Sequence, residues 1–266
     1  MIPKEHQAFI DNTVAILKQD SRIVGIALGG SYISGDMDQY SDLDFVIAVN
    51  PQDTAQIMSE RIEIAKKLGN LLSAFTGEHV GEPRLLVCLY DCPLMHVDLK
   101  FVSLDDAEKR IEDPVILYQK DNALSDAFAG MPAVFPYPDL QWMEDRFWVW
   151  VHYVAGKIAR GEIFEAIESI SFIRQNVVAQ LMQIKNGRLP RGVRHIEQSA
   201  PEDMPALIET IAVHDEQSCI SALRTLTRLY LELREPYCGQ KIEPRFYAQQ
   251  KALGYLESVA KKLPQT

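Results

Sequence analysis

The pattern of hydrophobic and polar residues in the first half of the chain predicts a sheet accompanied by helices. Residues 4–18 and 53–75 carry apolar side chains near helical spacing. A short continuous apolar run at residues 22–28 is typical of a strand that is buried on both faces, and residues 43–49 read as a second strand. A polar, glycine-containing loop lies between these two strands.

Two further strands are expected at residues 84–90 and 95–102, joined as a hairpin by Asp91-Cys92-Pro93. The pattern therefore predicts a mixed sheet with helices packed on it.

The pattern changes after residues 131–138, a proline-rich segment that is the best candidate linker in the chain. Beyond it, helical spacing dominates and strand signals almost vanish. Helices are expected at residues 140–160, 163–184, 205–213 and 216–233. We therefore expect an α+β domain at residues 1–135 and an all-α helical bundle at residues 136–266.

Composition and charge narrow the classes of function. With 266 residues, of which 47% are hydrophobic, the chain can bury a sizeable core. The net charge of −10 argues against a nucleic-acid partner, which requires clustered Lys and Arg, and is compatible with a cationic one. The N-terminal residues lack the pattern of a secretory signal, and no apolar stretch reaches 18 residues, so we expect a cytoplasmic protein without a membrane partner.

The cysteines give no sign of a structural zinc site or a disulfide framework. They form no CxxC pair, and we expect reduced thiols at Cys88, Cys92, Cys219 and Cys238.

The chemistry concentrates in residues 29–47. A Gly30-Ser31 turn follows the first strand, and Asp42 and Asp44 stand at the start of the next. Residues two apart in a strand point to the same face, so the two carboxylates would lie side by side and repel each other unless a cation binds between them. Mg²⁺ suits such a pair, since it binds carboxylates together with substrate phosphates. The backbone N–H groups of the turn and the Ser31 hydroxyl could hold those phosphates.

A third carboxylate, Asp98, lies in the apolar strand at residues 95–102. If this strand lies beside Asp42 and Asp44, three carboxylates converge on a two-metal site for phosphoryl transfer, and Asp98 could also accept a proton from an attacking hydroxyl. Plainer interpretations stay open: Asp42 and Asp44 as turn residues, or Asp98 balanced by Lys100 or an arginine. His96, two residues earlier on the same face, is expected to be a structural neighbour.

A resemblance to a known family rests on two motifs, Gly30-Ser31-Tyr32-x-x-Gly35 and Ser41-Asp42-x-Asp44. Together they resemble the signature of the polymerase-beta-type nucleotidyltransferase superfamily, and Asp98 stands where that family has its third acidic residue. More loosely, residues 114–121 and 147–162 look like segments of the aminoglycoside 6-adenylyltransferases, also called streptomycin adenylyltransferases. The sequence departs from the pattern at Ser34, where many members have a basic residue.

The resemblance implies an α+β nucleotidyltransferase-type catalytic domain followed by a helical bundle. It implies an enzyme that uses Mg²⁺ and ATP, or another nucleoside triphosphate, to transfer AMP to a hydroxyl of a small acceptor such as an aminoglycoside-like molecule, with release of pyrophosphate. The roles it implies are metal binding for Asp42 and Asp44, metal binding or general base catalysis for Asp98, phosphate binding for Gly30 and Ser31, and a triphosphate contact for Lys157.

Two other functions remain open at this point. One is a transferase that acts on a protein or nucleic-acid end, although the acidic charge counts against a polynucleotide. The other is a non-catalytic nucleotide-binding or interaction module. The aromatic-rich helical half also leaves room for a homodimer.

Overall fold

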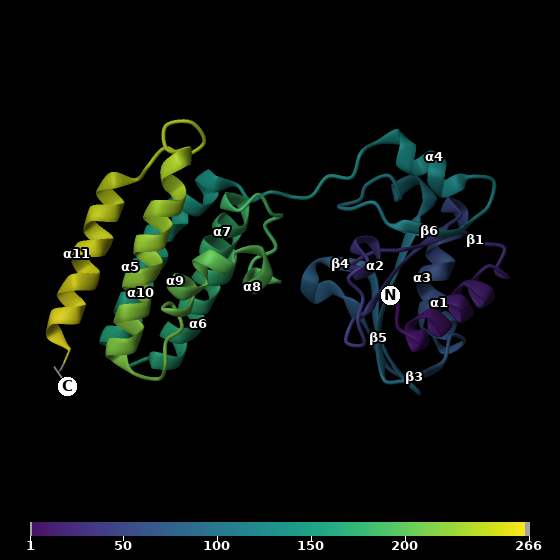
Figure 1. Cartoon of the computed structure of the whole chain (residues 1–266), viewed down its shortest axis with the longest axis horizontal. Coiled ribbons are helices and arrows are strands. Elements are labelled where there is room, and N and C mark those ends of the chain that lie inside the picture. The colour runs from purple at the N-terminus through teal and green to yellow at the C-terminus, as the bar shows by residue number, and fades with distance from the viewer. Residues whose placement is uncertain (1, 264–266) are drawn as a thin grey trace. The chain divides into compact units, whose positions relative to one another are not determined.

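The structure is a computed structural model that describes residues 2–263. The chain divides into two compact units, with the boundary between Pro136 and Tyr137 (Figure 1). Each unit has its own hydrophobic core, and each is described by itself below.

The first unit is built on a mixed sheet, as the pattern predicted. Its main elements are α1 (Lys4–Leu17), β1 (Ile23–Leu28), α2 (Ser31–Ser34), β2 (Leu43–Val49), α3 (Thr54–Lys66), β3 (Asn70–Gly77), β4 (Glu82–Asp91), β5 (Met95–Ser103), β6 (Val115–Gln119) and α4 (Ala123–Gly130). Over the described residues, the strands form one six-stranded sheet in the order β3-β4-β5-β2-β1-β6. The β2–β5 pair is parallel, whereas the other neighbouring pairs are antiparallel.

Helices cover both faces of this sheet. Ile10 of α1 and Ile57 of α3 pack with strand residues in the larger core cluster, and Leu124 of α4 packs in a second, smaller one. Strand β1 is buried at every position, as its continuous apolar run predicted. Burial of each large aliphatic side chain contributes roughly 1.5–3 kcal/mol, so the two layers fix the strand firmly.

One predicted helix is shorter than expected. Helical spacing predicts a helix to residue 75, but α3 ends at Lys66 and residues 70–77 form strand β3. Gly69 and Asn70 are residues that commonly follow a helix end. The apolar residues beyond them pair with β4, where Leu71 lies opposite Tyr90.

The β4–β5 hairpin is confirmed, with Cys92 and Pro93 in its turn. The hydrophobic pattern assigned no element to residues 115–119 or 123–130, which form β6 and α4. Strand β6 completes the sheet on the far side of β1.

The second unit is entirely helical over its described residues, in agreement with the predicted bundle. Its helices are α5 (Leu140–Ala159), α6 (Ile163–Ile173), α7 (Ala179–Lys185), α8 (Ile196–Ser199), α9 (Met204–Ile208), α10 (Glu216–Arg234) and α11 (Phe246–Lys262). A π-helical turn at Arg174–Val178 joins α6 to α7. Helix α5 contacts α6, α10 and α11. The sequence pattern did not reveal α11, and it extended the helix at α9 too far.

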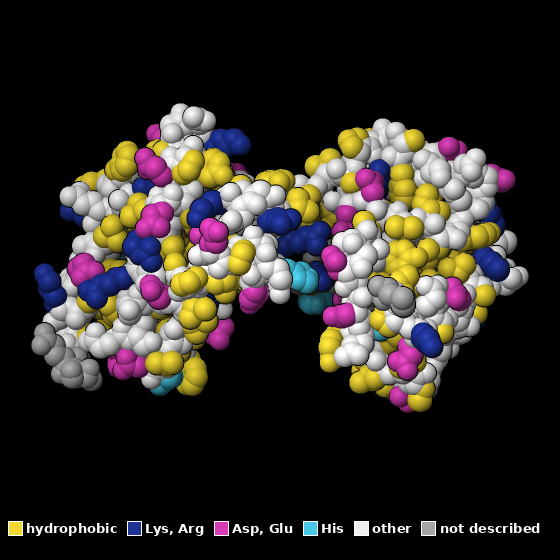
Figure 2. Space-filling view, in the orientation of Figure 1, with side chains coloured by type: hydrophobic (Ala, Val, Ile, Leu, Met, Phe, Trp, Pro, Cys, Tyr) yellow, Lys and Arg dark blue, Asp and Glu magenta, His cyan; other side chains and the backbone are white. Residues whose placement is uncertain are grey.

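Charged side chains of both signs are spread over the surface (Figure 2). On the face shown in Figure 2, acidic side chains are dispersed among hydrophobic and basic ones over each unit. Over residues 2–263, none of the helices combines the length and the apolar character needed to cross a membrane.

A fully buried carboxylate joins three helical segments of the second unit. Glu144 of α5 accepts hydrogen bonds from the Trp148 indole (3.0 Å), the Tyr230 hydroxyl (2.6 Å) and the Arg245 backbone N–H (2.8 Å), and it pairs with the Arg234 guanidinium. Burial alone would raise the pKa of this carboxyl. The hydrogen bonds from Arg234 and the other donors outweigh burial and lower the pKa below its ordinary value of 4.5.

Replacing Glu144 with Ala should lower the free energy of unfolding by about 3–5 kcal/mol, because it leaves the Arg234 charge buried without its main partner. The matched control is Glu257→Ala, which removes a half-exposed pair with Arg224 and should cost about 0–1 kcal/mol. Urea denaturation monitored by circular dichroism measures both changes.

Acid should weaken the same pair. Because folding lowers the pKa of Glu144, its stabilising contribution is fully present above pH 4.5 and is lost as the pH falls through the lower, folded value. The difference in stability between the wild type and Glu144→Ala should therefore shrink below pH 4.5. A difference that stays constant down to acid unfolding would contradict this interpretation.

Candidate functional site

The parallel pairing of β2 with β5 brings two of the predicted acidic residues together. Asp44 and Asp98 are register partners in these neighbouring strands, as Leu43 and Val97 are one step earlier. Register partners on adjacent strands point their side chains to the same face of a sheet. Asp42 directly precedes β2 and lies two residues before Asp44. The condition on which the sequence prediction depended, that the strand of Asp98 lies beside Asp44, is met.

The glycine turn that follows β1 lies directly against Asp44. The Gly29 N–H donates a hydrogen bond to the Asp44 carbonyl oxygen at 2.8 Å. Gly30 has a φ of +59°, and a Cβ atom added there would lie 2.0 Å from Oδ2 of Asp44. Only glycine therefore fits this position without displacing the carboxylate.

The hydroxyl group of Ser31 is buried and has no hydrogen-bond partner among the described residues. An unsatisfied buried hydroxyl costs about 1–3 kcal/mol, so a ligand oxygen that bonded to it would recover this energy. Ser31 directly follows Gly30, so this orphaned group belongs to the turn that lies against Asp44.

The chemistry of the donor set fits a hard divalent cation with phosphate oxygens. Asp42, Asp44 and Asp98 offer carboxylate oxygens, which Mg²⁺ prefers, and the turn offers the Ser31 hydroxyl. Over residues 2–263, however, no group of three or more His, Cys, Asp or Glu side chains is already arranged to hold a metal ion. The chemistry of the donor set fits the ion.

His96 lies beside Asp98. The ring Nε2 of His96 is 3.0 Å from Oδ1 of Asp98, and the His96 side chain is half exposed. Lys100, considered from the sequence as a partner for Asp98, forms an ion pair with Glu82 at 2.9 Å. The acidic site therefore has an exposed histidine at its edge.

Two contacts to the site were not predicted from the sequence. His6 of α1 is buried and its Nε2 lies 2.8 Å from the carbonyl oxygen of Ser41, the residue before Asp42; since a carbonyl only accepts, Nε2 carries the hydrogen. The Gly30 N–H donates to Oε1 of Glu112 at 2.9 Å. These partners lie 35 and 82 residues away along the chain, and no local motif marks them.

Cys88 lies on the strand next to β5, in the pair that faces Val97. Burial, with a smaller contribution from the charge of Asp98, raises the pKa of the Cys88 thiol to about 12. The thiol is therefore neutral near pH 7 and is unsuited to act as a nucleophile beside the carboxylates. All four cysteines are free, as expected.

Lys157 lies on α5 in the second unit. Its Nζ pairs with Oε2 of Glu162 at 2.5 Å and lies 5.2 Å from the centre of the Tyr153 ring. The hydrogen bond to Glu162 raises the pKa of Lys157, so the side chain is charged at neutral pH. Within its own unit, Lys157 thus has an acidic partner.

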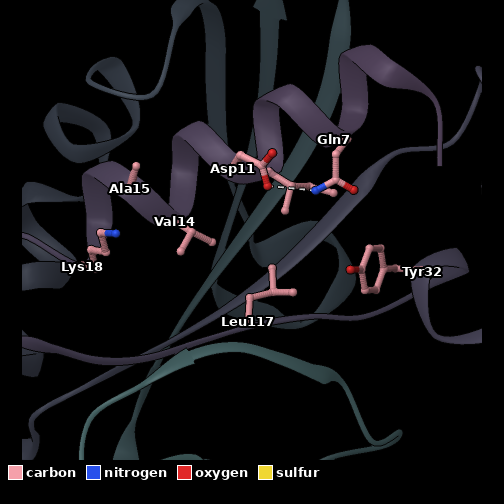
Figure 3. Close-up of a pocket in the computed structure, with 8 residues that line it drawn as sticks. Gln7, Asp11, Val14, Ala15, Lys18, Tyr32 and Leu117 are labelled. Atoms are coloured by element: carbon pink, nitrogen blue, oxygen red, sulfur yellow. Dashed lines mark hydrogen bonds between the residues drawn. The ribbon is translucent and has the colours of Figure 1, made fainter.

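A cavity of about 210 Å³ lies elsewhere on the first unit (Figure 3). Helix α1 contributes most of its lining, including Gln7, whose amide donates to Asp11 at 2.8 Å. Leu117 of β6 and Tyr32, the residue after Ser31, complete it. The cavity and the turn at Gly30 and Ser31 therefore both involve helix α2, but different side chains line the cavity.

Replacing Gly30 with Ala should destabilise the protein more than replacing Gly35, the matched control in the same loop. Both glycines have positive φ. The left-handed conformation of Gly35 (φ +74°, ψ 12°) costs alanine roughly 1–2 kcal/mol, and the conformation of Gly30 (φ +59°, ψ −138°), which is nearly restricted to glycine, adds to its cost. A Cβ at Gly35 meets nothing within 4 Å, whereas one at Gly30 collides with Asp44. Urea denaturation of the two variants measures the difference, and equal losses of stability would show that the collision is relieved without cost.

Comparison with known proteins bears on the same segment of the chain. Residues 10–80 match the family model of the nucleotidyltransferase domain, and this segment contains Gly30, Ser31, Asp42 and Asp44. No curated protein sequence matches the chain.

Several solved structures are similar at low sequence identity. An aminoglycoside 6-adenyltransferase from Bacillus subtilis is 17% identical, with a TM-score of 0.36 and 95% of each chain covered. A nucleotidyltransferase-like protein from Exiguobacterium sibiricum is 13% identical, with a TM-score of 0.40, over 98% of this chain and 81% of that one. A spectinomycin adenyltransferase from Enterococcus faecialis, solved with ATP and spectinomycin, is 14% identical, with a TM-score of 0.32, over 96% and 99%.

The family match confirms the resemblance that the two motifs predicted. Residues 10–80 of the first unit are therefore similar to the nucleotidyltransferase domain.

Proposed function

We propose that the protein transfers a nucleoside monophosphate, AMP from ATP in the first instance, to a hydroxyl group of a small acceptor and releases pyrophosphate. The observation that carries the proposal is the parallel register that sets Asp44 beside Asp98, with the Gly30 turn against Asp44. The match of residues 10–80 to the nucleotidyltransferase domain supports the same class of reaction.

Each residue of the site has a chemical task in this reaction. Asp42, Asp44 and Asp98 would hold Mg²⁺, which when bound neutralises charge on the phosphate groups. The Ser31 hydroxyl, buried and lacking a partner, would donate a hydrogen bond to a phosphate oxygen, as would the Gly30 N–H. These donors orient the triphosphate and favour the charge that develops as pyrophosphate leaves.

In the transfer step, one bond to phosphorus forms, another breaks, and one proton is transferred. The acceptor oxygen forms a bond to the α-phosphorus, and the bond from that phosphorus to the oxygen bridging to the β-phosphate breaks. Pyrophosphate leaves with the electron pair of the broken bond. Asp98 would accept the proton of the acceptor hydroxyl as a general base.

A small, hydroxylated and cationic acceptor suits the charge of the protein. The net charge of −10 favours the approach of a cation over that of a polyanion. An aminoglycoside-like molecule carries both the hydroxyl groups and the positive charge. The looser resemblance of residues 114–121 and 147–162 to aminoglycoside 6-adenylyltransferases supports the same class of acceptor.

Replacing any one of Asp42, Asp44 or Asp98 with Asn should lower the rate of pyrophosphate release at least about 100-fold, because a metal ion supplies several kcal/mol to such a transition state. The control is Asp36→Asn, which removes an exposed carboxylate from the same loop and should leave the rate unchanged. The measurement is pyrophosphate release with Mg²⁺, each of the four nucleoside triphosphates and a panel of aminoglycosides and other hydroxylated acceptors.

Two results would count against the proposal. Pyrophosphate release that persists in all three Asn variants would show that these carboxylates do not take part in the reaction. Absence of release with every nucleotide and acceptor, while nucleotide still binds, would favour a non-catalytic nucleotide-binding module.

Lys157 provides a second test, as a contact to the triphosphate. Lys157→Met should raise KM for ATP about tenfold or more, since a charge-assisted hydrogen bond to phosphate would be lost. Glu162→Gln weakens the ion pair that holds Lys157 and should lower KM instead. Opposite shifts in the two variants are the expected signature, and unchanged KM in both would show that this ion pair is structural.

A further inference from the structure

An acidic side chain of the protein already occupies the N–H group that is expected to bind phosphate. The Gly30 N–H donates to Oε1 of Glu112 at 2.9 Å. A carboxylate oxygen resembles a phosphate oxygen in charge and in its capacity to accept hydrogen bonds. The next residue, Ser31, has a buried hydroxyl without a partner among the described residues. In this turn, the Gly30 N–H therefore has an acceptor, while the neighbouring Ser31 hydroxyl has none among the described residues.

The segment that carries Glu112 is firmly anchored on its N-terminal side. Arg110 donates to the carbonyl oxygens of Phe128 (2.9 Å) and Met131 (2.8 Å), and it forms an ion pair with Asp113 at 2.6 Å. Strand β6 begins three residues after Glu112. Glu112 therefore lies in a short segment that is held at Arg110 on one side and by strand β6 on the other.

The position of Glu112 also brings negative charges close together. A Cβ added at Gly29 would lie 2.9 Å from Oε1 of Glu112 and 3.7 Å from Cβ of Asp44, so both side chains approach one turn. Like charges in such a place repel each other, and the Gly30 N–H offsets part of that cost for Glu112. An incoming triphosphate would bring further negative charge to the same point, where it and the Glu112 carboxylate exclude one another.

We propose that Glu112 is an internal anion that occupies the Gly30 N–H in the nucleotide-free protein and that a phosphate oxygen displaces it on binding. This inference rests on the proposed function, because it takes the turn to be the triphosphate site. The carboxylate of Glu112 must then leave the Gly30 N–H before a phosphate oxygen can bind there. The apparent affinity for triphosphate is therefore lower when Glu112 occupies the N–H in a larger fraction of the molecules. Glu112 thereby sets the nucleotide concentration at which the site fills.

The test measures binding to the wild type, Glu112→Gln and Glu112→Ala by isothermal titration calorimetry. The probes are ATP with Mg²⁺, inorganic tripolyphosphate and adenosine. Glu112→Ala should bind ATP and tripolyphosphate about tenfold more tightly or better, because the competing acceptor is gone. Glu112→Gln, which keeps a neutral acceptor of the same shape, should show a smaller gain. Adenosine binding should not change in either variant.

The matched control is Asp105→Asn, which removes one exposed negative charge from the same connecting segment and should leave all three affinities unchanged. A second measurement reports the contact directly. The Gly30 amide proton resonance of the free protein should move upfield in Glu112→Ala, as a hydrogen bond to a carboxylate is lost. Urea denaturation of each variant shows whether its fold is intact.

The outcomes separate this inference from the proposed function. Equal or weaker binding of ATP and tripolyphosphate by folded Glu112→Ala, including no binding by any protein, would overturn it and would make Glu112 a ligand-binding or structural side chain. Equal gains in Asp105→Asn would reduce the effect to net charge and would also overturn it. Tighter binding of tripolyphosphate without pyrophosphate release for any acceptor would uphold the competition while the proposed function fails.

Discussion

The parallel pairing of β2 with β5 is the constraint on which the candidate site depends. A parallel pair cannot be joined by a tight turn, and here the connection runs through α3, β3 and the β4–β5 hairpin. Its register sets Asp44 opposite Asp98. A slip of one residue would turn Asp98 to the other face of the sheet, where Val97, Leu99 and Phe101 now pack in the larger core cluster. The hydrophobic core therefore fixes the register, and the register places the two acidic residues side by side on one face of the sheet.

Local sequence patterns predicted the parts of the molecule whose signals are local. The continuous apolar run of β1, the two acidic residues two apart, and the glycine turn each lie within a few neighbouring residues, and each appears in the structure where it was expected. Strand β3 was missed because its apolar residues also satisfy helical spacing, and only its pairing with β4 distinguishes the two. Strand β6 and the contact of Glu112 with Gly30 were missed because each depends on partners that are distant in sequence. Helix α11 does carry a local signal, the helical spacing of Ala252, Leu256 and Val259, which the prediction overlooked. The metal and phosphate roles of the site residues remain predictions.

The second unit illustrates the same limit in a helical setting. Glu144 reads in the sequence as an ordinary polar residue of an amphipathic helix, yet it is completely buried. Its partners come from α10 and from the residue that precedes α11, so that one carboxylate joins three segments. Such a group specifies a single arrangement of helices, because any other arrangement would leave a charge buried without donors. Periodicity alone carries no information about this requirement.

Strand β1 has a consequence for the dynamics of the site. It has a hydrogen-bonded strand on each edge and a helical layer on each face, so its amide hydrogens should exchange with solvent only when the whole unit unfolds. The Gly29-Gly30 turn directly follows this strand, so we expect its backbone to be rigid as well. The turn should therefore keep its conformation when a ligand binds there. Any accommodation must then come from the side chains opposite the turn, which makes the turn the fixed reference point against which the rest of the site adjusts.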